Sequence, residues 1–127
     1  MTKKQGLSVS LKNYLKEIYI LESMGKPVRV TDIALTLGIS KASVNKAIRG
    51  LKEIEYIYHE YYSTIRLTPE GKAAAVEIWE AYQAAYTFLV DILHVSEDEA
   101  REEACQIGHV LKKDTCHKLQ ILIKEHE

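Results

Sequence analysis

Residues 31–53 constrain the fold most strongly, because they join two short helical patterns through a turn of three residues. Thr31 can cap a helix of about two turns that Gly38 ends, and Ser40 can cap a second helix over residues 41–53. The second helix has one apolar face, and polar and basic residues occupy the opposite face. Two helices joined in this way predict a helix-turn-helix arrangement.

A β-hairpin is expected directly after this pair. Residues 54–67 are rich in Tyr, Ile and Thr, with strands predicted at 57–60 and 64–67 around a polar tip at 61–63. A hairpin in this position makes the helix-turn-helix winged.

A helix precedes the pair, and three helices follow the hairpin. The first is predicted over residues 10–24, with Ser10 as its N-cap, and packs behind the pair. After the hairpin, Thr68 can cap a long alanine-rich helix that runs to about Leu93. Two shorter helices are expected at the end of the sequence, at residues 96–110 and 113–124.

These elements predict a mainly α-helical protein with a small β-hairpin wing. A winged helix-turn-helix domain is expected over residues 1–70, and a helical dimerisation domain over residues 71–127. Charge supports the division, since Met1–Thr68 carries +5, Pro69–Glu127 carries −6, and the chain sums to −1. A basic half suits a polyanion, whereas an acidic half suits protein contact or cation binding.

Several classes of protein are not expected. No run approaches the roughly 20 apolar residues of a membrane helix, and the N-terminus does not resemble a signal peptide. Two cysteines cannot build a disulfide framework, so a reduced, cytoplasmic location is expected. The sequence contains no phosphate loop, HExxH motif or Rossmann fingerprint, and an enzyme is not expected.

The second helix of the pair carries the predicted DNA contacts. A major groove about 12 Å wide admits one helix, whose first turns touch the base edges. Asparagine can pair with adenine and lysine can donate to guanine, so Asn45 and Lys46 are expected to read bases. Ser43 could reach a base or a phosphate, although each of these side chains could equally be an ordinary solvent-facing residue. The full predicted DNA-binding set is Ser40, Lys41, Ala42, Ser43, Asn45, Lys46, Arg49 and the wing's Arg66.

Five stretches of the chain match a known family of regulators. They are residues 14–21, 28–34, 43–46, 67–71 and 103–109. Through them the sequence resembles, over nearly its whole length, the metal-dependent regulators typified by the diphtheria toxin repressor and the manganese transport regulator. The resemblance implies a homodimer joined through C-terminal helices, with its winged domains on a palindromic operator. Recognition helices in such a dimer lie about 34 Å apart, one turn of DNA.

The resemblance also implies a divalent transition metal, Mn or Fe, as the switch, but this chain departs from the family at most ligand positions. Asn13, Lys16, Tyr82 and Gly108 stand where the family has donors. A manganese site needs hard oxygen ligands. Metal control is therefore expected to be weakened, lost or rebuilt, and the cofactor stays open. One way to rebuild it is an ion pair between Lys16 and an acidic residue such as Glu102.

Cys105 and His109 are the donors that survive, and they are the predicted metal ligands. They lie four residues apart on one helical face, so a soft ion could bridge them if Asn13, Cys116, His117 or water completed its sphere. The alternative is structural, with Cys105 a buried small residue and His109 a hydrogen-bonded one.

Together these patterns predict a homodimeric transcriptional repressor that binds duplex DNA and acts by steric occlusion. Two alternatives stay open. One is a redox-responsive or small-molecule-responsive winged-helix regulator, sensing through Cys105 or Cys116 or through a pocket lined by Trp79, Tyr82 and Tyr86. The other is a protein-interaction module that does not bind DNA.

Overall fold

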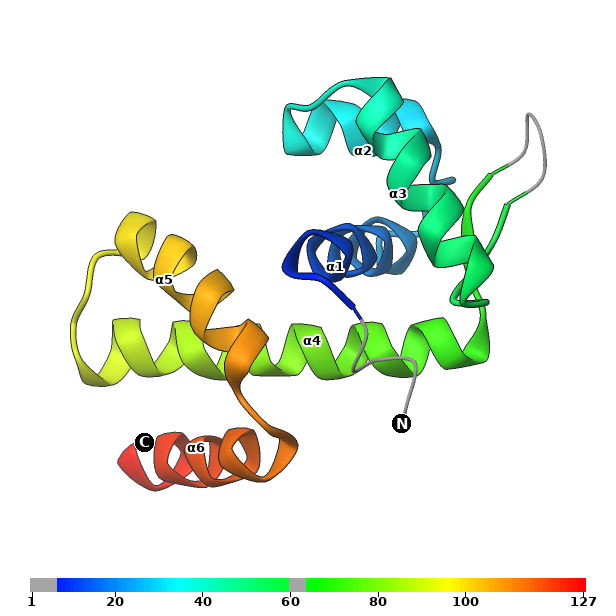
Figure 1. Ribbon diagram of the computed structural model, residues 1–127. Coiled ribbons are helices and arrows are strands. Elements are labelled where there is room, and N and C mark those ends of the chain that lie inside the picture. Colours follow the sequence, from blue (N-terminus) through cyan, green and yellow to red (C-terminus); the bar gives the residue numbers. More distant parts are fainter. Residues whose placement is uncertain (1–6, 60–63) are drawn as a thin grey trace. The chain divides into compact units, whose positions relative to one another are not determined.

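The computed structural model describes residues 7–59 and 64–127 and confirms the mainly helical class with a small antiparallel wing (Figure 1). In chain order the elements are α1 Val9–Ser23, α2 Val30–Leu37, α3 Lys41–Glu53, β1 Ile57–Tyr58, β2 Arg66–Leu67, α4 Pro69–Thr87, η2 Phe88–Ile92, α5 Glu97–Val110 and α6 Lys113–His126. The chain divides into two compact units, Met1–Val76 and Glu77–Glu127. None of the described helices combines the length and hydropathy that a membrane crossing requires.

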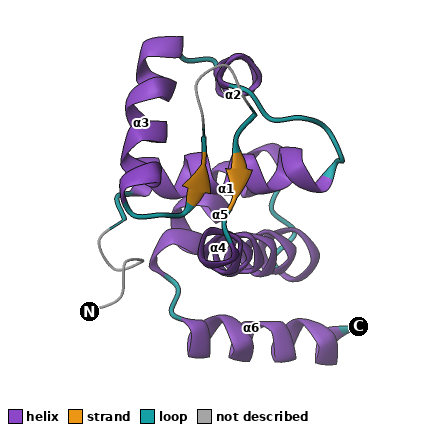
Figure 2. Ribbon diagram, turned by 90° about the vertical axis from the view of Figure 1, so that its right-hand side faces the viewer, coloured by secondary structure: helices purple, strands orange, loops and turns teal. Residues whose placement is uncertain are grey.

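The first unit is built around one apolar core shared by α1, α2, α3 and the wing. Its largest fully buried side chains are Leu15, Ile18, Val28, Ile33, Val44, Leu51 and Ile65. They come from each of those elements or their connections, so the helix-turn-helix pair cannot form its core without α1 and the strands. Figure 2 shows the two strands side by side in this unit.

The wing is a short antiparallel ladder in which Ile57 pairs with Leu67 and Tyr58 pairs with Arg66. Its strands are shorter than predicted, at two residues each. The backbone N–H of Ile65 donates to the Val28 carbonyl at 2.7 Å, which ties the wing to the segment before α2. The predicted tip at residues 61–63 lies outside the described residues.

The predicted start of the first helix is wrong by one residue, and its predicted N-cap is wrong by two. The helix begins at Val9, because the Ser8 hydroxyl accepts the Leu11 N–H at 3.1 Å. Ser10 therefore lies inside the first turn. Two serines that are two residues apart offer equivalent caps, and the local pattern does not choose between them.

The predicted N-cap of the second helix is also wrong, since Thr31 lies inside α2. The Asp32 carboxylate accepts the Arg29 N–H at 2.9 Å, and this places the cap at Arg29. Asp32 thus supplies the side chain of a capping box that reaches back to the N-cap backbone. The helix therefore starts at Val30, before the predicted cap Thr31.

The second unit packs its helices closely through small residues. Ala85, Leu89, Ala100 and Ala104 form one buried cluster between α4, η2 and α5. Ala81, Ala84 and Cys116 form another, against α6. Alanine side chains add little bulk, so the helix backbones can approach one another.

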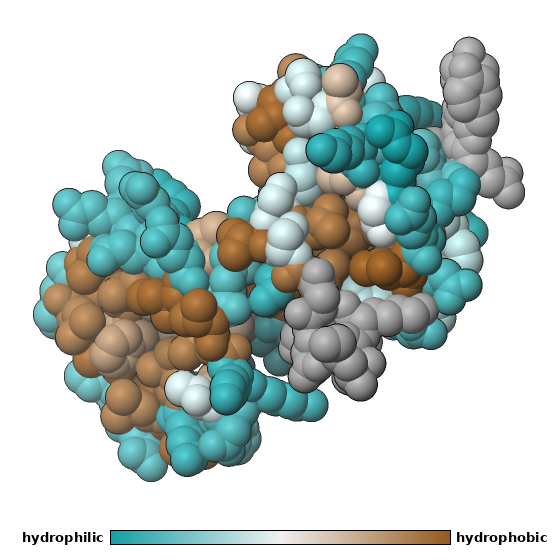
Figure 3. Space-filling view, in the orientation of Figure 1, coloured by the Kyte–Doolittle hydropathy of each residue, from teal (hydrophilic) through white to brown (hydrophobic). Residues whose placement is uncertain are grey.

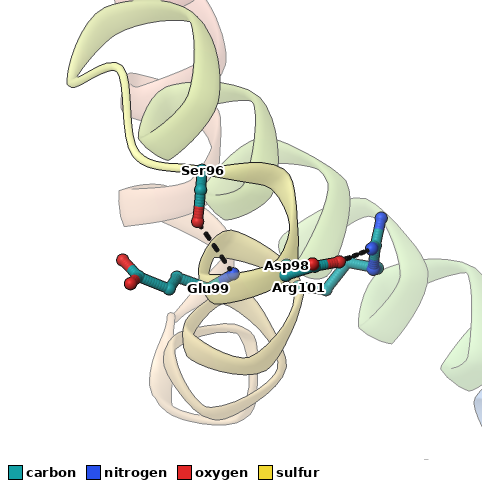
Figure 4. A network of polar contacts seen from close by, with 4 residues as sticks. All are labelled: Ser96, Asp98, Glu99 and Arg101. Carbon is teal, nitrogen blue, oxygen red and sulfur yellow. Dashed lines mark hydrogen bonds and ion pairs between the residues drawn. The ribbon is translucent and has the colours of Figure 1, made fainter.

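The long helix ends differently from the prediction. Its α-helical part stops at Thr87 and continues as the π-helix η2, in which the Leu93 N–H donates to the Phe88 carbonyl at 3.1 Å. Helix α5 then begins as expected after Ser96, whose hydroxyl accepts the Glu99 N–H at 3.4 Å (Figure 4). Figure 4 also shows the ion pair between Asp98 and Arg101 in the same turn.

Candidate DNA interface and effector site

The turn between α2 and α3 has the geometry that the sequence predicts. Gly38 has φ +65°, a left-handed conformation that suits glycine and ends α2. Two residues later the Ser40 hydroxyl accepts the Ser43 N–H at 3.1 Å and starts α3. Each helix end is therefore fixed by a local interaction, which sets the angle at which α3 leaves the turn.

Helix α3 buries one face and exposes the other. Its buried side chains are Val44, Ala47, Ile48 and Leu51. All eight residues of the predicted DNA-binding set are exposed, seven of them at the start and along the outer face of α3 and the eighth, Arg66, on β2. Figure 3 shows hydrophilic surface over α3. Seven of the predicted contacts thus share an accessible helix face, the eighth is exposed on the wing, and their contact with DNA stays a prediction.

The exposed face of α3 is strongly cationic. The helix carries Lys41, Lys46, Arg49 and Lys52 against a single acid, Glu53, in its last turn. An exposed helix fits the width of the major groove, and its cationic face attracts the phosphate backbone over several ångströms.

Glu22 positions the wing and was not found from the sequence. This half-buried side chain lies at the end of α1, and its carboxylate oxygen Oε2 accepts the Leu67 N–H of β2 at 3.0 Å. The contact joins residues 45 positions apart, so no local pattern points to it. It holds the strand that carries Arg66 against α1.

Replacing Glu22 by alanine is expected to weaken DNA binding, although it removes a negative charge from the basic unit. The Leu67 N–H loses a charged acceptor, which lowers the free energy of unfolding by about 1.5–3 kcal/mol. A loosened β2 misplaces Arg66, and we expect an affinity loss of about 1 kcal/mol, roughly fivefold in Kd. Fluorescence anisotropy with a labelled duplex measures it. Glu125→Ala, at an exposed position of α6, is the control for the charge, and tighter binding by Glu22→Ala would contradict this role.

The residues at which the resemblance implies metal donors occur in both units. Asn13 and Lys16 are half-buried on α1, in the first unit. In the second unit, Cys105 and His109 are half-buried on α5, with the Cys105 sulfur 3.8 Å from His109 Nε2. The ion pair predicted between Lys16 and Glu102 would join the two units and stays a hypothesis.

These residues do not fit a manganese or iron ion. Within the described ranges, no group of three or more His, Cys, Asp or Glu side chains could hold a metal. Burial raises the pKa of the Tyr82 phenol above its usual 10, with Tyr86 adding to the effect, so the ring carries a protonated hydroxyl at neutral pH rather than an anionic ligand. A thiol and an imidazole are softer donors than manganese prefers. The metal role of Cys105 and His109 stays a prediction.

The structure also locates the residues on which the redox-responsive and small-molecule-responsive alternatives depend. Cys116 is buried on α6, and burial, reinforced by Glu80, raises its pKa, which keeps it a poorly reactive thiol. Trp79 lines an open groove of about 620 Å³ between α4 and α6. Tyr82 and Tyr86 instead pack against the α4–α5 cluster.

The turn, the exposed cationic helix and the wing together define a winged helix-turn-helix DNA-binding protein that carries a helical C-terminal unit. Comparison with known proteins agrees with this class. Residues 6–65 match the N-terminal DNA binding domain of the iron dependent repressors, and residues 68–127 match their metal binding and dimerisation domain. The chain belongs to the iron-dependent repressor family.

Individual relatives are similar over most of the chain. An uncharacterized HTH-type transcriptional regulator of Methanocaldococcus jannaschii is 30% identical over 120 residues, which cover 94% of this chain and 96% of that protein. The HTH-type transcriptional regulator MntR of Bacillus pumilus is 29% identical over 118 residues, which cover 93% of this chain and 81% of that protein. The solved structure of the manganese regulator SloR has the same fold, with a TM-score of 0.80 at 22% identity over 90% of this chain. This chain covers 53% of the SloR chain, about half its length.

Proposed function

We propose that the protein is a homodimeric transcriptional repressor that binds a palindromic DNA site and excludes other proteins from it. DNA binding is assigned to residues 1–70 and dimerisation to residues 71–127. The observation that carries the proposal is the outward cationic face of α3, directly after a capped turn and beside a wing. The function needs no catalytic step, and we propose a cytoplasmic location for it.

The predicted contacts divide by chemistry. Asn45 and Lys46 lie on the exposed face within the first two turns of α3, where side chains can reach base edges, and we assign them to base readout. Lys41, Arg49 and Arg66 are assigned to phosphates, which position the protein without reading sequence. Exposed hydroxyls at Ser40 and Ser43, 3.0 Å apart, and the small side chain of Ala42 complete the surface.

The second unit supplies the surface for dimerisation. Four large apolar side chains are exposed there: Leu93, Val110, Ile121 and Leu122. Figure 3 shows apolar surface gathered over this unit. Exposed apolar area of this kind favours association, and a two-fold dimer would present two α3 helices to successive turns of one duplex face.

Selection of bound duplexes from a random-sequence pool, followed by sequencing, tests the proposal. The full-length protein is expected to enrich a palindrome whose half-sites are centred about one helical turn apart. Enrichment of an unpaired half-site would contradict the dimer. Recovery of no preferred sequence would contradict base readout and favour the protein-interaction alternative.

A further inference from the structure

Helices α4 and α5 approach each other closely at Gly108. A Cβ atom added to Gly108 would lie 3.1 Å from the backbone nitrogen of Tyr82 and 3.2 Å from its Cα. Both contacts are with backbone, which cannot rotate away as the end of a side chain can. Glycine is therefore the residue that allows this approach.

The two residues in this contact occupy positions where the resemblance implies metal donors. Tyr82 stands on α4 and Gly108 on α5, and here the two helices meet directly. We propose that this contact replaces the family's metal ion, so that the α4–α5 joint assembles without manganese or iron. The inference concerns the second unit alone and does not rest on DNA binding.

Aromatic and small side chains pack around the contact. The Tyr82 ring stacks between Trp79, at a centroid distance of 5.6 Å, and Tyr86, at 6.1 Å. Ala85, Ala100 and Ala104 are buried beside it in the α4–α5 cluster. The three rings all lie on α4, so their stacking is internal to that helix. Burial of alanines from both helices is what packs α4 against α5, and it needs no ion.

Two polar side chains lie on α5 on either side of the Gly108 position, Cys105 and His109. Cys105 and His109 face each other across one turn of α5, with sulfur and Nε2 3.8 Å apart, within reach of a weak sulfur–nitrogen hydrogen bond whose donor depends on the imidazole tautomer. A pair of this kind gives the sulfur and the nitrogen a partner within one helix. The α4–α5 joint therefore rests on the close backbone approach at Gly108 and on the buried alanine cluster, while the Cys105–His109 interaction stays within α5.

Thermal melting of the full-length protein with and without metals tests the inference. After exhaustive chelation and dialysis, we expect Tm to stay within about 1 °C when Mn²⁺, Co²⁺ or, under anaerobic conditions, Fe²⁺ is added. An ion bound in the joint at roughly a hundredfold excess over its Kd would raise Tm by several degrees. A rise of that size with any of the three ions would overturn the proposal.

A glycine pair tests the contact itself. Gly108→Ala is expected to melt several degrees below Gly50→Ala, because both variants gain helix propensity but only at residue 108 must the neighbouring backbone move by a few tenths of an ångström to admit the methyl group. Gly50→Ala is the matched control, since Gly50 is also helical and its added Cβ would meet Leu11 side-chain carbons at an ordinary 3.8 Å. A Gly108→Ala protein as stable as the control would contradict the contact.

Zinc separates the metal-free joint from a soft-ion site at the surviving donors. We expect stoichiometric Zn²⁺ to change the Tm of the wild type no more than it changes the Tm of Cys105→Ser. A zinc-dependent rise that disappears in that variant would establish Cys105 as a ligand and overturn the proposal. DNA affinity is not measured in any of these experiments, so their outcome is independent of the proposed DNA-binding function.

Discussion

Replacing Gly71 by alanine is expected to lower the free energy of unfolding by about 3 kcal/mol or more. A Cβ atom at this position would lie 1.8 Å from the Tyr56 carbonyl oxygen and 2.7 Å from its carbon. The start of α4 must therefore separate from the start of the wing. Whole-domain stabilities are about 5–15 kcal/mol, so the loss would be a large share of the total.

Thr68 explains why the segment cannot simply move aside. Its side chain is buried, donates to the Glu55 carbonyl at 2.7 Å and accepts the Gly71 N–H at 3.0 Å. The Thr68 N–H donates to the same Tyr56 carbonyl at 3.1 Å. Displacement of Gly71 strains all three hydrogen bonds together. Urea unfolding followed by circular dichroism measures the loss against Gly50→Ala, and equal stability of the two variants would refute this account.

Lys46→Ala and Arg49→Ala are expected to weaken DNA binding in different ways. Removal of a base-reading side chain at Lys46 should cost about 1–3 kcal/mol on the selected site and relax the preference at one base pair. Removal of a phosphate-binding side chain at Arg49 should weaken selected and scrambled duplexes alike. It should also make the slope of log K against log salt less negative by about 1 for each phosphate that is no longer neutralised. Anisotropy titrations with both duplexes separate the two effects.

Lys118→Ala provides the control for lost positive charge, because this exposed lysine lies on α6 and pairs there with Asp114 at 3.2 Å. Its affinity should remain near that of the wild type. Should Arg49→Ala alter base preference while Lys46→Ala weakens every duplex equally, the assigned roles of the two residues would be reversed.

The helix-turn-helix and its exposed face could be predicted from sequence because their signals are local. The break at Gly38, the cap at Ser40 and the spacing of Val44, Ala47, Ile48 and Leu51 each lie within a few residues of the structure they specify. The confirmed α3 bounds, Lys41–Glu53, follow from that. The first two N-caps were mispredicted for the same reason. Ser8 and Ser10 are both possible caps of the first helix, and Asp32 fixes the start of the second helix by accepting the N–H of Arg29, three residues before it.

Features that depend on distant contacts could not be predicted. The bond from Glu22 to the wing joins the end of α1 to β2, and the closeness of Gly108 to Tyr82 arises only when α5 folds against α4. The family resemblance implies a donor at the position of Gly108, whereas the structure gives this glycine a packing role. The π-helix at Phe88–Ile92 likewise has no periodic signal distinct from that of an α-helix.

The cationic face of α3 is expected to bind duplex DNA, and titration of a labelled duplex over about 50–200 mM salt tests this most directly. With Lys41, Arg49 and Arg66 on phosphates in both protomers, the slope of log K against log salt is predicted to be roughly −5. An affinity that is absent at the lowest salt, or that does not change with salt, would contradict the account.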